Sequence, residues 1–164
     1  VLNMPVSNRY YQVFEYMFVL SKGILNTSNL LKIKTKHRGV NKNSTTRNED
    51  GTLKKHKYET GKSTRTKDNV WDYGVGYMKS TTDLYAFDHP AMFPEALARD
   101  HILSWSNPGD LVLDPMMGSG TTGKMACLYD RNFVGIEISQ EYMDIAEKRI
   151  KMVQQQPKLF EAAS

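Results

Sequence analysis

The sequence has little of what secreted, disulfide-linked or membrane-spanning proteins need. Among its 164 residues there is one cysteine, Cys127, so no disulfide can form within the chain. It contains no run of 18 apolar residues, and we therefore expect no membrane span. No charged-then-apolar segment opens the chain, so export is not expected. These absences predict a protein of the reducing cytoplasm, with Cys127 as a small core residue.

What is present fits one domain with a real core. The length corresponds to about one domain, and apolar residues make up 40% of the chain with aromatics at 10%. The predicted elements are a buried strand over Gln12–Ser21, irregular structure over 26–68, short strands and turns over 71–85, a helix from Pro94 to about Trp105, a turn at 107–109, a strand over Leu111–Asp114, a helix over Thr121–Tyr129, a strand over Phe133–Ile138 and a helix over Gln140–Gln155. Apolar residues recur at helical spacing in the last helix, which predicts a core face of Met143, Ala146, Ile150 and Val153. Strand–helix–strand–helix at the end of the chain predicts a parallel α/β sheet with helical cover.

Charge is distributed unevenly. Segment 32–67 holds twelve Lys or Arg residues and three acids, a net charge of +9, whereas the whole chain is +4 and the remainder is therefore −5. Clustered cations are favoured by a polyanion because binding releases its counterions, so we expect this segment to bind nucleic acid. A solvated, disordered lysine-rich loop is the alternative. The expected contacts are Lys34, Lys36, Arg38, Lys42, Arg47, Lys54, Lys55, Lys57 and Arg65.

The most informative stretch is 111–123, where an apolar strand ends in an acid and turns through glycines into a helix. The acid lies at the carboxyl end of the strand, where open α/β sheets bind ligands. The glycines lack a Cβ, so a ligand can approach the main chain, and the threonines can cap the helix. These groups are Asp114, Gly118, Gly120, Thr121 and Thr122. Alternatively, the acid bonds only the amides of its own loop.

Two families with similar loops fit less well. Residues Gly118–Lys124 satisfy most of the phosphate-binding P-loop, but the next residue, Met125, has no hydroxyl to hold magnesium. The Gly-x-Gly-x-x-Gly pattern that begins at Gly118, with Glu137 as the ribose-binding acid, satisfies the dinucleotide fingerprint. Only 27 residues follow Glu137, too few for the substrate domain of an oxidoreductase. The Asp-Pro before the glycines is foreign to both families.

The stretch Asp114-Pro115-Met116-Met117-Gly118-Ser119-Gly120-Thr121-Thr122 closely resembles the S-adenosylmethionine loop of amino-methylating DNA methyltransferases, which usually have Phe where this chain has Met116 or Met117. Three further stretches are similar to motifs of that family: His89–Leu97 before the cofactor strand, Phe133–Glu137 as the second strand, and Tyr142–Ile150 as the following helix. Near the start, residues 9–22 resemble a late strand of the catalytic half. The resemblance covers residues 8–23 and 69–153.

The resemblance implies S-adenosylmethionine as cofactor and no metal. Glu137 would accept hydrogen bonds from the ribose hydroxyls, although it could simply cap the next helix. His89 would contact the cofactor, although a structural role fits it equally. The full implied set is His89, Ala91, Phe93, Asp114, Pro115, Met117, Gly118, Ser119, Gly120, Thr121, Thr122 and Glu137.

One motif of the family is missing. Its catalytic loop reads Asp/Asn/Ser-Pro-Pro-aromatic, and no such tetrapeptide occurs in this sequence. In the family order with the catalytic half first, the loop would lie upstream of the strand matching residues 12–22. The basic segment would then be the target-recognition region. The resemblance thus implies the carboxyl-terminal portion of an enzyme whose upstream half, or a homo-oligomer partner, supplies the rest.

The sequence therefore predicts a Rossmann-like α/β methyltransferase sheet with helical cover, incomplete in this chain and interrupted by a basic irregular segment. Residues 1–25 and 86–157 would form the methyltransferase core, 26–85 the target-recognition segment and 158–164 a tail. The expected activity is methyl transfer from S-adenosylmethionine to a base amino group of double-stranded DNA, adenine N6 first, in a cytoplasmic enzyme of bacterial or phage type. The alternatives are a cytosine-N4 methyltransferase, an inactive DNA- or cofactor-binding fragment, and a dinucleotide-dependent oxidoreductase.

Overall fold

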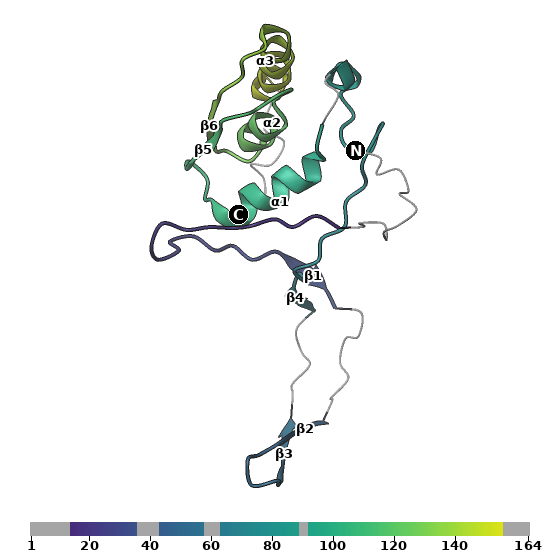
Figure 1. Cartoon of the computed structure of the whole chain (residues 1–164), viewed down its shortest axis with the longest axis vertical. Coiled ribbons are helices and arrows are strands. Elements are labelled where there is room, and N and C mark those ends of the chain that lie inside the picture. Colours follow the sequence, from purple (N-terminus) through teal and green to yellow (C-terminus); the bar gives the residue numbers. More distant parts are fainter. Residues whose placement is uncertain (1–13, 36–42, 58–62, 89–91, 156–164) are drawn as a thin grey trace, which may run out of the picture.

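The computed structural model describes residues 14–35, 43–57, 63–88 and 92–155 (Figure 1). Its carboxyl-terminal part is a β–α–β–α unit made of β5 (Leu111–Asp114), α2 (Thr121–Leu128), β6 (Asn132–Gly135) and α3 (Gln140–Gln155), preceded by α1 (Glu95–Trp105). The two strands pair in parallel, from Leu111 opposite Asn132 to Asp114 opposite Gly135. The predicted parallel α/β arrangement is confirmed, although the second strand ends three residues earlier than expected. The result is part of a Rossmann-like fold.

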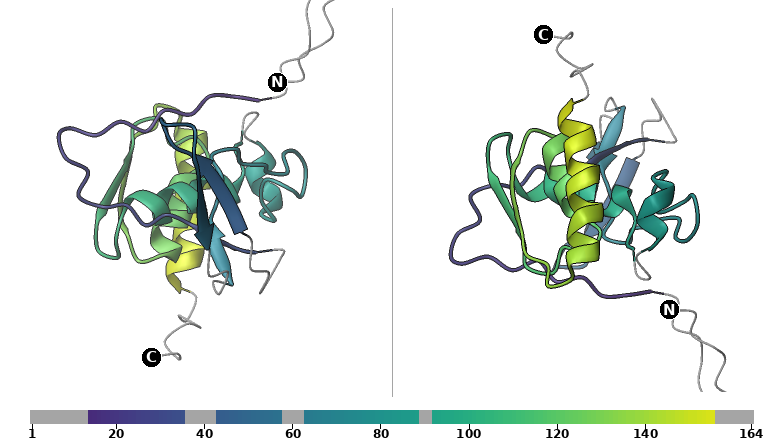
Figure 2. Two further views of the ribbon diagram at one scale, coloured as in Figure 1. Left: turned by 90° about the horizontal axis from the view of Figure 1, so that it is seen from below. Right: turned by 90° about the horizontal axis from the view of Figure 1, so that it is seen from above.

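The helices lie on one side of the parallel pair (Figures 1 and 2). The core between them contains Ala98 and Ile102 of α1 and Met125 and Ala126 of α2, with Val112, Phe133 and Tyr129 packed against it. From α3, Ala146 is fully buried. Period-two alternation along the strands explains why Val112 and Phe133 reach this core, whereas their neighbours point to the opposite face of the sheet.

That opposite face is bare. Leu111 and Leu113 of β5 are 65% and 59% exposed, and Val134 and Ile136, in and just after β6, are 47% and 52% exposed. Parallel sheets are normally covered on both faces. Among the described residues, β5 also pairs with no strand other than β6, so one of its edges carries unpaired backbone groups.

The basic segment is more regular than predicted. It contains β1 (Lys32–Lys34), β2 (Asn43–Arg47), β3 (Leu53–Lys57) and β4 (Thr64–Thr66), with β1 antiparallel to β4 and β2 antiparallel to β3. The β2–β3 turn closes where Gly51, at φ +82°, donates its amide to the Asn48 carbonyl. The expectation of irregular structure over 26–68 is therefore wrong for these four strands, and residues 36–42 and 58–62 lie outside the described ranges. Figure 1 shows the β2–β3 hairpin projecting away from the helices.

The end of the basic segment that follows β4 is held on α1. Lys67 Nζ lies 2.7 Å from Asp100 Oδ2, and the Tyr73 hydroxyl donates to the same oxygen at 2.7 Å. Burial acts to raise the pKa of Asp100, but hydrogen bonds from Lys67, Tyr73 and Arg99 outweigh it and lower that pKa. The charged carboxylate is thus held at the joint between the basic segment and the helices.

Two further expectations are wrong. The described part of the predicted first strand, residues 14–20, has no regular structure, and Phe18 and Leu20 are 81% and 90% exposed. A strand needs a neighbouring strand for its amides and carbonyls, and no strand in the described ranges is paired with this segment. Residues 71–85 contain the expected turns but no strand, and a 3-10 helix, η1, spans Leu84–Asp88.

Candidate cofactor site

The glycine loop is tied to the residue that follows β6. The Gly118 amide donates to Glu137 Oε2 at 2.9 Å, while Glu137 Oε1 accepts from the amides of Ile138 and Ser139, each at 2.9 Å. The half-buried carboxylate therefore bridges the loop after β5 and the segment before α3. The capping alternative for Glu137 does not match these contacts: the amides that it binds precede α3, whereas the first turn of α3 is capped by Ser139, whose hydroxyl accepts the Tyr142 amide at 3.4 Å. The position of Glu137 at the carboxyl edge of the sheet is also where ligand hydroxyls are held in such folds.

Asp114 binds backbone amides at the point where the chain leaves β5 and enters the loop. Its Oδ1 accepts the Met116 amide at 3.1 Å, and its carbonyl accepts the amide of Ile136. The alternative that Asp114 bonds its own loop thus matches the structure. Beyond it, Pro115 and Met116 are exposed, whereas Met117 is only 6% exposed because its side chain lies against Gly135. The loop leaves the sheet at an exposed point and turns back into the core.

Gly120 is required by helix packing. It has φ +77°, and a Cβ placed there would lie 2.6 Å from the Ala146 Cβ and 2.8 Å from its Cα. The bare face of Gly120 is therefore occupied by α3, which corrects the expectation that it opens toward a ligand. Gly120 is also the N-cap of α2 and no side chain caps that helix, so the expectation that Thr121 and Thr122 cap it is wrong.

The predicted loop residues differ in accessibility. Ser119 and Thr121 are buried, at 3% and 2% exposure, and Thr122 is half-buried. Phe93, at 39% exposure, lines a groove of about 480 Å³ together with Thr122, Leu97 and Val112. His89 and Ala91 lie outside the described residues. The structure thus brings together the loop and Glu137, while the groove containing Phe93 reaches the end of the loop at Thr122.

A buried cluster of charges lies behind the loop, and sequence reasoning missed it. Arg149 of α3 has no exposed side-chain surface and binds Asp83 at 3.0 Å and Glu95 at 2.7 Å. Lys124 of α2 binds the same two carboxylates at 2.7 and 2.8 Å. This charge cluster of Arg149, Lys124, Asp83 and Glu95 joins three helices and the loop before η1. In a P-loop the lysine reaches the phosphates of the nucleotide, whereas Lys124 is paired with Asp83 and Glu95. The structure therefore also argues against a P-loop in this segment.

Within the charge cluster, Asp83 is stabilised in its charged form. Burial acts to raise the pKa of Asp83, but hydrogen bonds from Lys124 and Arg149 outweigh burial and lower it.

In α2, burial raises the pKa of the Cys127 thiol, which is half-buried as part of the helix packing. Cys127 is therefore a poorly reactive thiol, in keeping with the predicted structural role.

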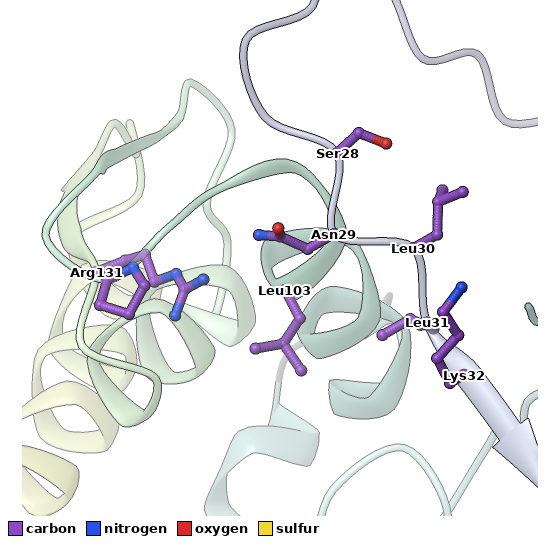
Figure 3. A pocket seen from close by; sticks show the side chains of 8 residues that line it. Ser28, Asn29, Leu30, Leu31, Lys32, Leu103 and Arg131 are labelled. Atoms are coloured by element: carbon purple, nitrogen blue, oxygen red, sulfur yellow. The ribbon is translucent and has the colours of Figure 1, made fainter. Parts of the chain in front are cut away.

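Another cavity lies away from the glycine loop. Its volume is about 740 Å³, and it is lined by the segment 28–32 together with Leu103, Pro108 and Arg131 (Figure 3). Arg131 donates to the carbonyls of Ser106 and Tyr129 near the ends of α1 and α2, which is a helix-capping role. Pro108 and Arg131 precede β5 and β6, so this cavity lies at the amino ends of the strands, away from the edge at which α/β sheets bind ligands.

The predicted nucleic-acid contacts are only partly described. Lys34, Arg47, Lys54 and Lys55 are exposed, whereas exposed Arg65 is already paired with Asp68 through two hydrogen bonds. Lys57 is the last residue of β3. Lys36, Arg38 and Lys42 lie outside the described residues. Within the predicted set, the exposed cations of β2 and β3 are therefore the best placed to contact nucleic acid.

Two classes of site find no support in the described ranges. Within them, no group of three or more His, Cys, Asp or Glu is arranged to hold a metal ion. No helix in the same part of the chain combines the length and apolar character needed to cross a membrane.

The parallel strand pair, the glycine loop and the acid at the carboxyl edge define an α/β unit of the kind that binds nucleotide-like cofactors. The family model of N6/N4 methyltransferases, described as DNA methylase, matches residues 2–148. The chain belongs to this DNA methylase family.

Relatives agree with this assignment. The chain is 51% identical over 154 residues to the orphan methyltransferase M.BamHII of Bacillus amyloliquefaciens, covering 92% of this chain and 58% of that protein. It is 46% identical over 83 residues to the DNA adenine methyltransferase YhdJ of Escherichia coli (strain K12), covering 50% of this chain and 27% of that protein. A crystal structure of an M1.HpyAVI-SAM complex matches with a TM-score of 0.40 and 35% identity, covering 53% of this chain and 47% of that one. The chain thus spans about three fifths or less of these proteins.

Proposed function

We propose that this chain is the cofactor-binding and DNA-contacting portion of a DNA methyltransferase that methylates a base amino group, with adenine N6 as the first candidate. The observation that carries the proposal is the tie between Gly118 and Glu137 at the carboxyl edge of a parallel sheet, in a member of the DNA methylase family. Support for adenine comes from the similarity to YhdJ, a DNA adenine methyltransferase. Cytosine N4 is the alternative, because the matching family model comprises N6 and N4 methyltransferases alike.

The residues at the site suit S-adenosylmethionine. Glu137 offers a half-buried carboxylate as acceptor for paired ribose hydroxyls, and Phe93 offers an aromatic face at the neighbouring groove. When bound, the cofactor supplies a methyl group on a positively charged sulfur. The role of this chain is to fix the position of that methyl group through the 114–122 loop and Glu137. The target base, which must leave the DNA stack to be reached, would be held by residues outside this sequence.

The β2–β3 hairpin is the proposed DNA contact. It is a two-stranded ribbon, the kind of element that the DNA major groove admits. Thr45 faces Lys55 across the ladder, and Arg47 faces Leu53, so Arg47 and Lys55 share one face of the ribbon while Lys54 and Thr46 share the other. We propose that the face carrying Arg47 and Lys55 follows the phosphate backbone.

Completion by a second half is also part of the proposal. The bare sheet face contains Leu111, Leu113, Val134 and Ile136, and the free edge of β5 runs beside the groove that contains Phe93. In that groove the buried nitrogens His101 Nε2 and Trp105 Nε1 find no hydrogen-bond partner among the described residues. Uncovered apolar surface together with unpaired polar atoms is costly, which supports an additional layer of protein on this side. An upstream catalytic half is the proposed occupant, and a second copy of the chain is the alternative.

The proposal is tested with purified residues 1–164 and two cofactors. S-adenosylmethionine and NAD are added separately, and the melting temperature is measured with each, followed by calorimetric titration. S-adenosylmethionine should raise the melting temperature, because a ligand that binds only the folded state stabilises it, whereas NAD should not. Stabilisation by NAD alone would favour the oxidoreductase alternative and refute the proposal. The DNA part is tested by titration with a duplex, and loss of all duplex binding would limit the role of the chain to the cofactor.

A further inference from the structure

Arg149 contacts the glycine loop from behind. Its Nη1 donates to the Ser119 carbonyl at 2.8 Å, to the Ser119 hydroxyl at 3.3 Å and to the Thr121 hydroxyl at 3.1 Å. The Arg149 side chain has no exposed surface, and Ser119 and Thr121 are almost fully buried. One buried guanidinium therefore holds two consecutive parts of the loop, namely the turn and the first residue of α2.

The turn at this point needs such a restraint. Ser119 lies between Gly118 at φ +52° and Gly120 at φ +77°, two residues with wide conformational freedom. The peptide that joins Ser119 to Gly120 presents its carbonyl to Arg149 and its amide to the Met117 carbonyl at 2.9 Å. If this peptide plane rotated, both hydrogen bonds would break. Arg149 thus fixes the orientation of the peptide at the centre of the loop.

The other nitrogens of Arg149 explain why a cation can remain there. Nε donates to Asp83 and Nη2 to Glu95, and Lys124 completes a set of two cations and two acids. A buried charge is tolerated when it is paired and its hydrogen bonds are satisfied. Lys124 shares both acids with Arg149, but its ammonium has no hydrogen bond to the glycine loop. The two cations of the charge cluster therefore differ in one contact that matters for the loop.

We propose that Arg149 is a positioning residue for the cofactor: it holds the Ser119–Gly120 peptide so that Gly118 can meet Glu137 in the geometry that binds S-adenosylmethionine. This inference rests on the proposed function and goes beyond it by naming a residue that acts through the loop. Arg149 lies behind the loop rather than at its ligand side, so its effect on the cofactor is indirect. Lys124 contributes to stability alone.

The experiment compares R149Q, R149K and the matched control K124Q in residues 1–164. Each variant is measured at the same interval below its own melting temperature. Differences between variants then do not arise from a general loss of stability. The first measurement is amide hydrogen exchange at Gly120 without cofactor, and the second is calorimetric affinity for S-adenosylmethionine. In R149Q we expect Gly120 to exchange at least tenfold faster and the affinity to fall at least tenfold. In K124Q both should stay within about threefold of the parent.

R149K separates charge from geometry and covers the case in which R149Q does not fold. Lysine keeps a positive charge beside Asp83 and Glu95, but one ammonium cannot also reach Ser119 as the forked guanidinium does. We expect it to recover stability while Gly120 still exchanges fast and the cofactor still binds weakly. Parent-like exchange and affinity in R149K, or equal losses in R149Q and K124Q, would overturn the proposal. If the parent chain fails to bind S-adenosylmethionine, the proposed function fails, while exchange at Gly120 still decides whether Arg149 holds the loop.

Discussion

The amide of Gly118 and the carboxylate of Glu137 are joined by a hydrogen bond of 2.9 Å. The two residues follow neighbouring parallel strands, so this bond links the turn after β5 to the turn after β6 at the carboxyl edge of the sheet. Glu137 consequently shapes the loop in addition to offering acceptors for a ligand. Any change at Glu137 is expected to affect the loop and the cofactor together.

Replacing Glu137 with alanine should weaken S-adenosylmethionine and S-adenosylhomocysteine alike, since both contain the ribose. The expected loss is tenfold or more, roughly 1.4 kcal/mol, measured by calorimetry. Glu137→Gln is the matched control because it keeps the size and one acceptor oxygen while it removes the charge. It should fall between the parent and Glu137→Ala. Unchanged affinity for both ligands in folded Glu137→Ala would leave Glu137 with only its role in linking the two loops.

Replacing Gly120 with alanine should destabilise the chain, because the new Cβ would lie 2.6 Å from the Ala146 Cβ in a backbone at φ +77°. The combined cost of overpacking and the left-handed backbone is about 3 kcal/mol. Chemical denaturation measures it. The double variant Gly120→Ala/Ala146→Gly removes one of the two colliding carbons and should recover part of the loss. If Gly120→Ala were as stable as the parent, the packing of α3 against the loop would be different from the one described.

The sequence predicts the β5–α2–β6–α3 unit well because each part is specified locally. Apolar runs of strand length, a turn with two glycines and an amphipathic helix leave few alternatives, and the helix from Pro94 to Trp105 is confirmed to within a residue. The first predicted strand, around Phe18, fails because its apolar pattern depends on neighbours that the described residues do not provide. Strand pairing is a tertiary property, and a pattern alone does not supply the partner.

The hairpin and the charge cluster were missed for different reasons. Asp50-Gly51 between threonine- and lysine-containing stretches is a hairpin signal, but the low apolar content of the segment favoured an irregular interpretation. Arg149 lies three residues after Ala146 and next to Ile150, on the core side of α3. A cation at a core position was the available signal. Its partners Asp83 and Glu95 come from distant segments, so the sequence did not identify them.

Stability should decline in acid through Asp83. Its pKa is lowered below the ordinary value of 3.8 in the folded chain, so the folded state binds this proton less readily than the unfolded state. The stabilisation is therefore complete above about pH 5 and is lost as the pH falls through the unfolded-state and then the lowered pKa. Asp83→Asn should cost about 3 kcal/mol at pH 7, because it leaves buried Arg149 and Lys124 with less compensation. The dependence of the melting temperature on pH below about 5 should be shallower in this variant than in the parent.

DNA contact by the β2–β3 hairpin is tested by comparing variants on its two faces. Arg47→Gln/Lys55→Gln removes two cations from one face, and Lys54→Gln removes one cation from the opposite face. The double variant should weaken duplex binding and reduce the slope of log affinity against log salt by roughly 0.9 for each lost phosphate contact. Lys54→Gln should change the slope less. Equal slopes in the parent and the double variant would show that this face does not touch phosphate.

The last prediction concerns the bare sheet face and the free edge of β5. Leu113 and Val134 lie on parallel neighbours, in register, and are 59% and 47% exposed, so they form the centre of an apolar surface that water contacts. We expect residues 1–164 alone to self-associate or to be marginally stable, and to transfer no methyl group, because no Pro-Pro-aromatic loop occurs in the sequence. Leu113→Lys should reduce self-association in sedimentation measurements, because a charge on this face opposes burial. Co-expression with an upstream half that carries such a loop should restore methylation to the parent chain, and Leu113→Lys should impair that restoration. Strong methylation of DNA by residues 1–164 alone would contradict the proposal that an upstream half completes the enzyme, since it would require a catalytic loop within these residues.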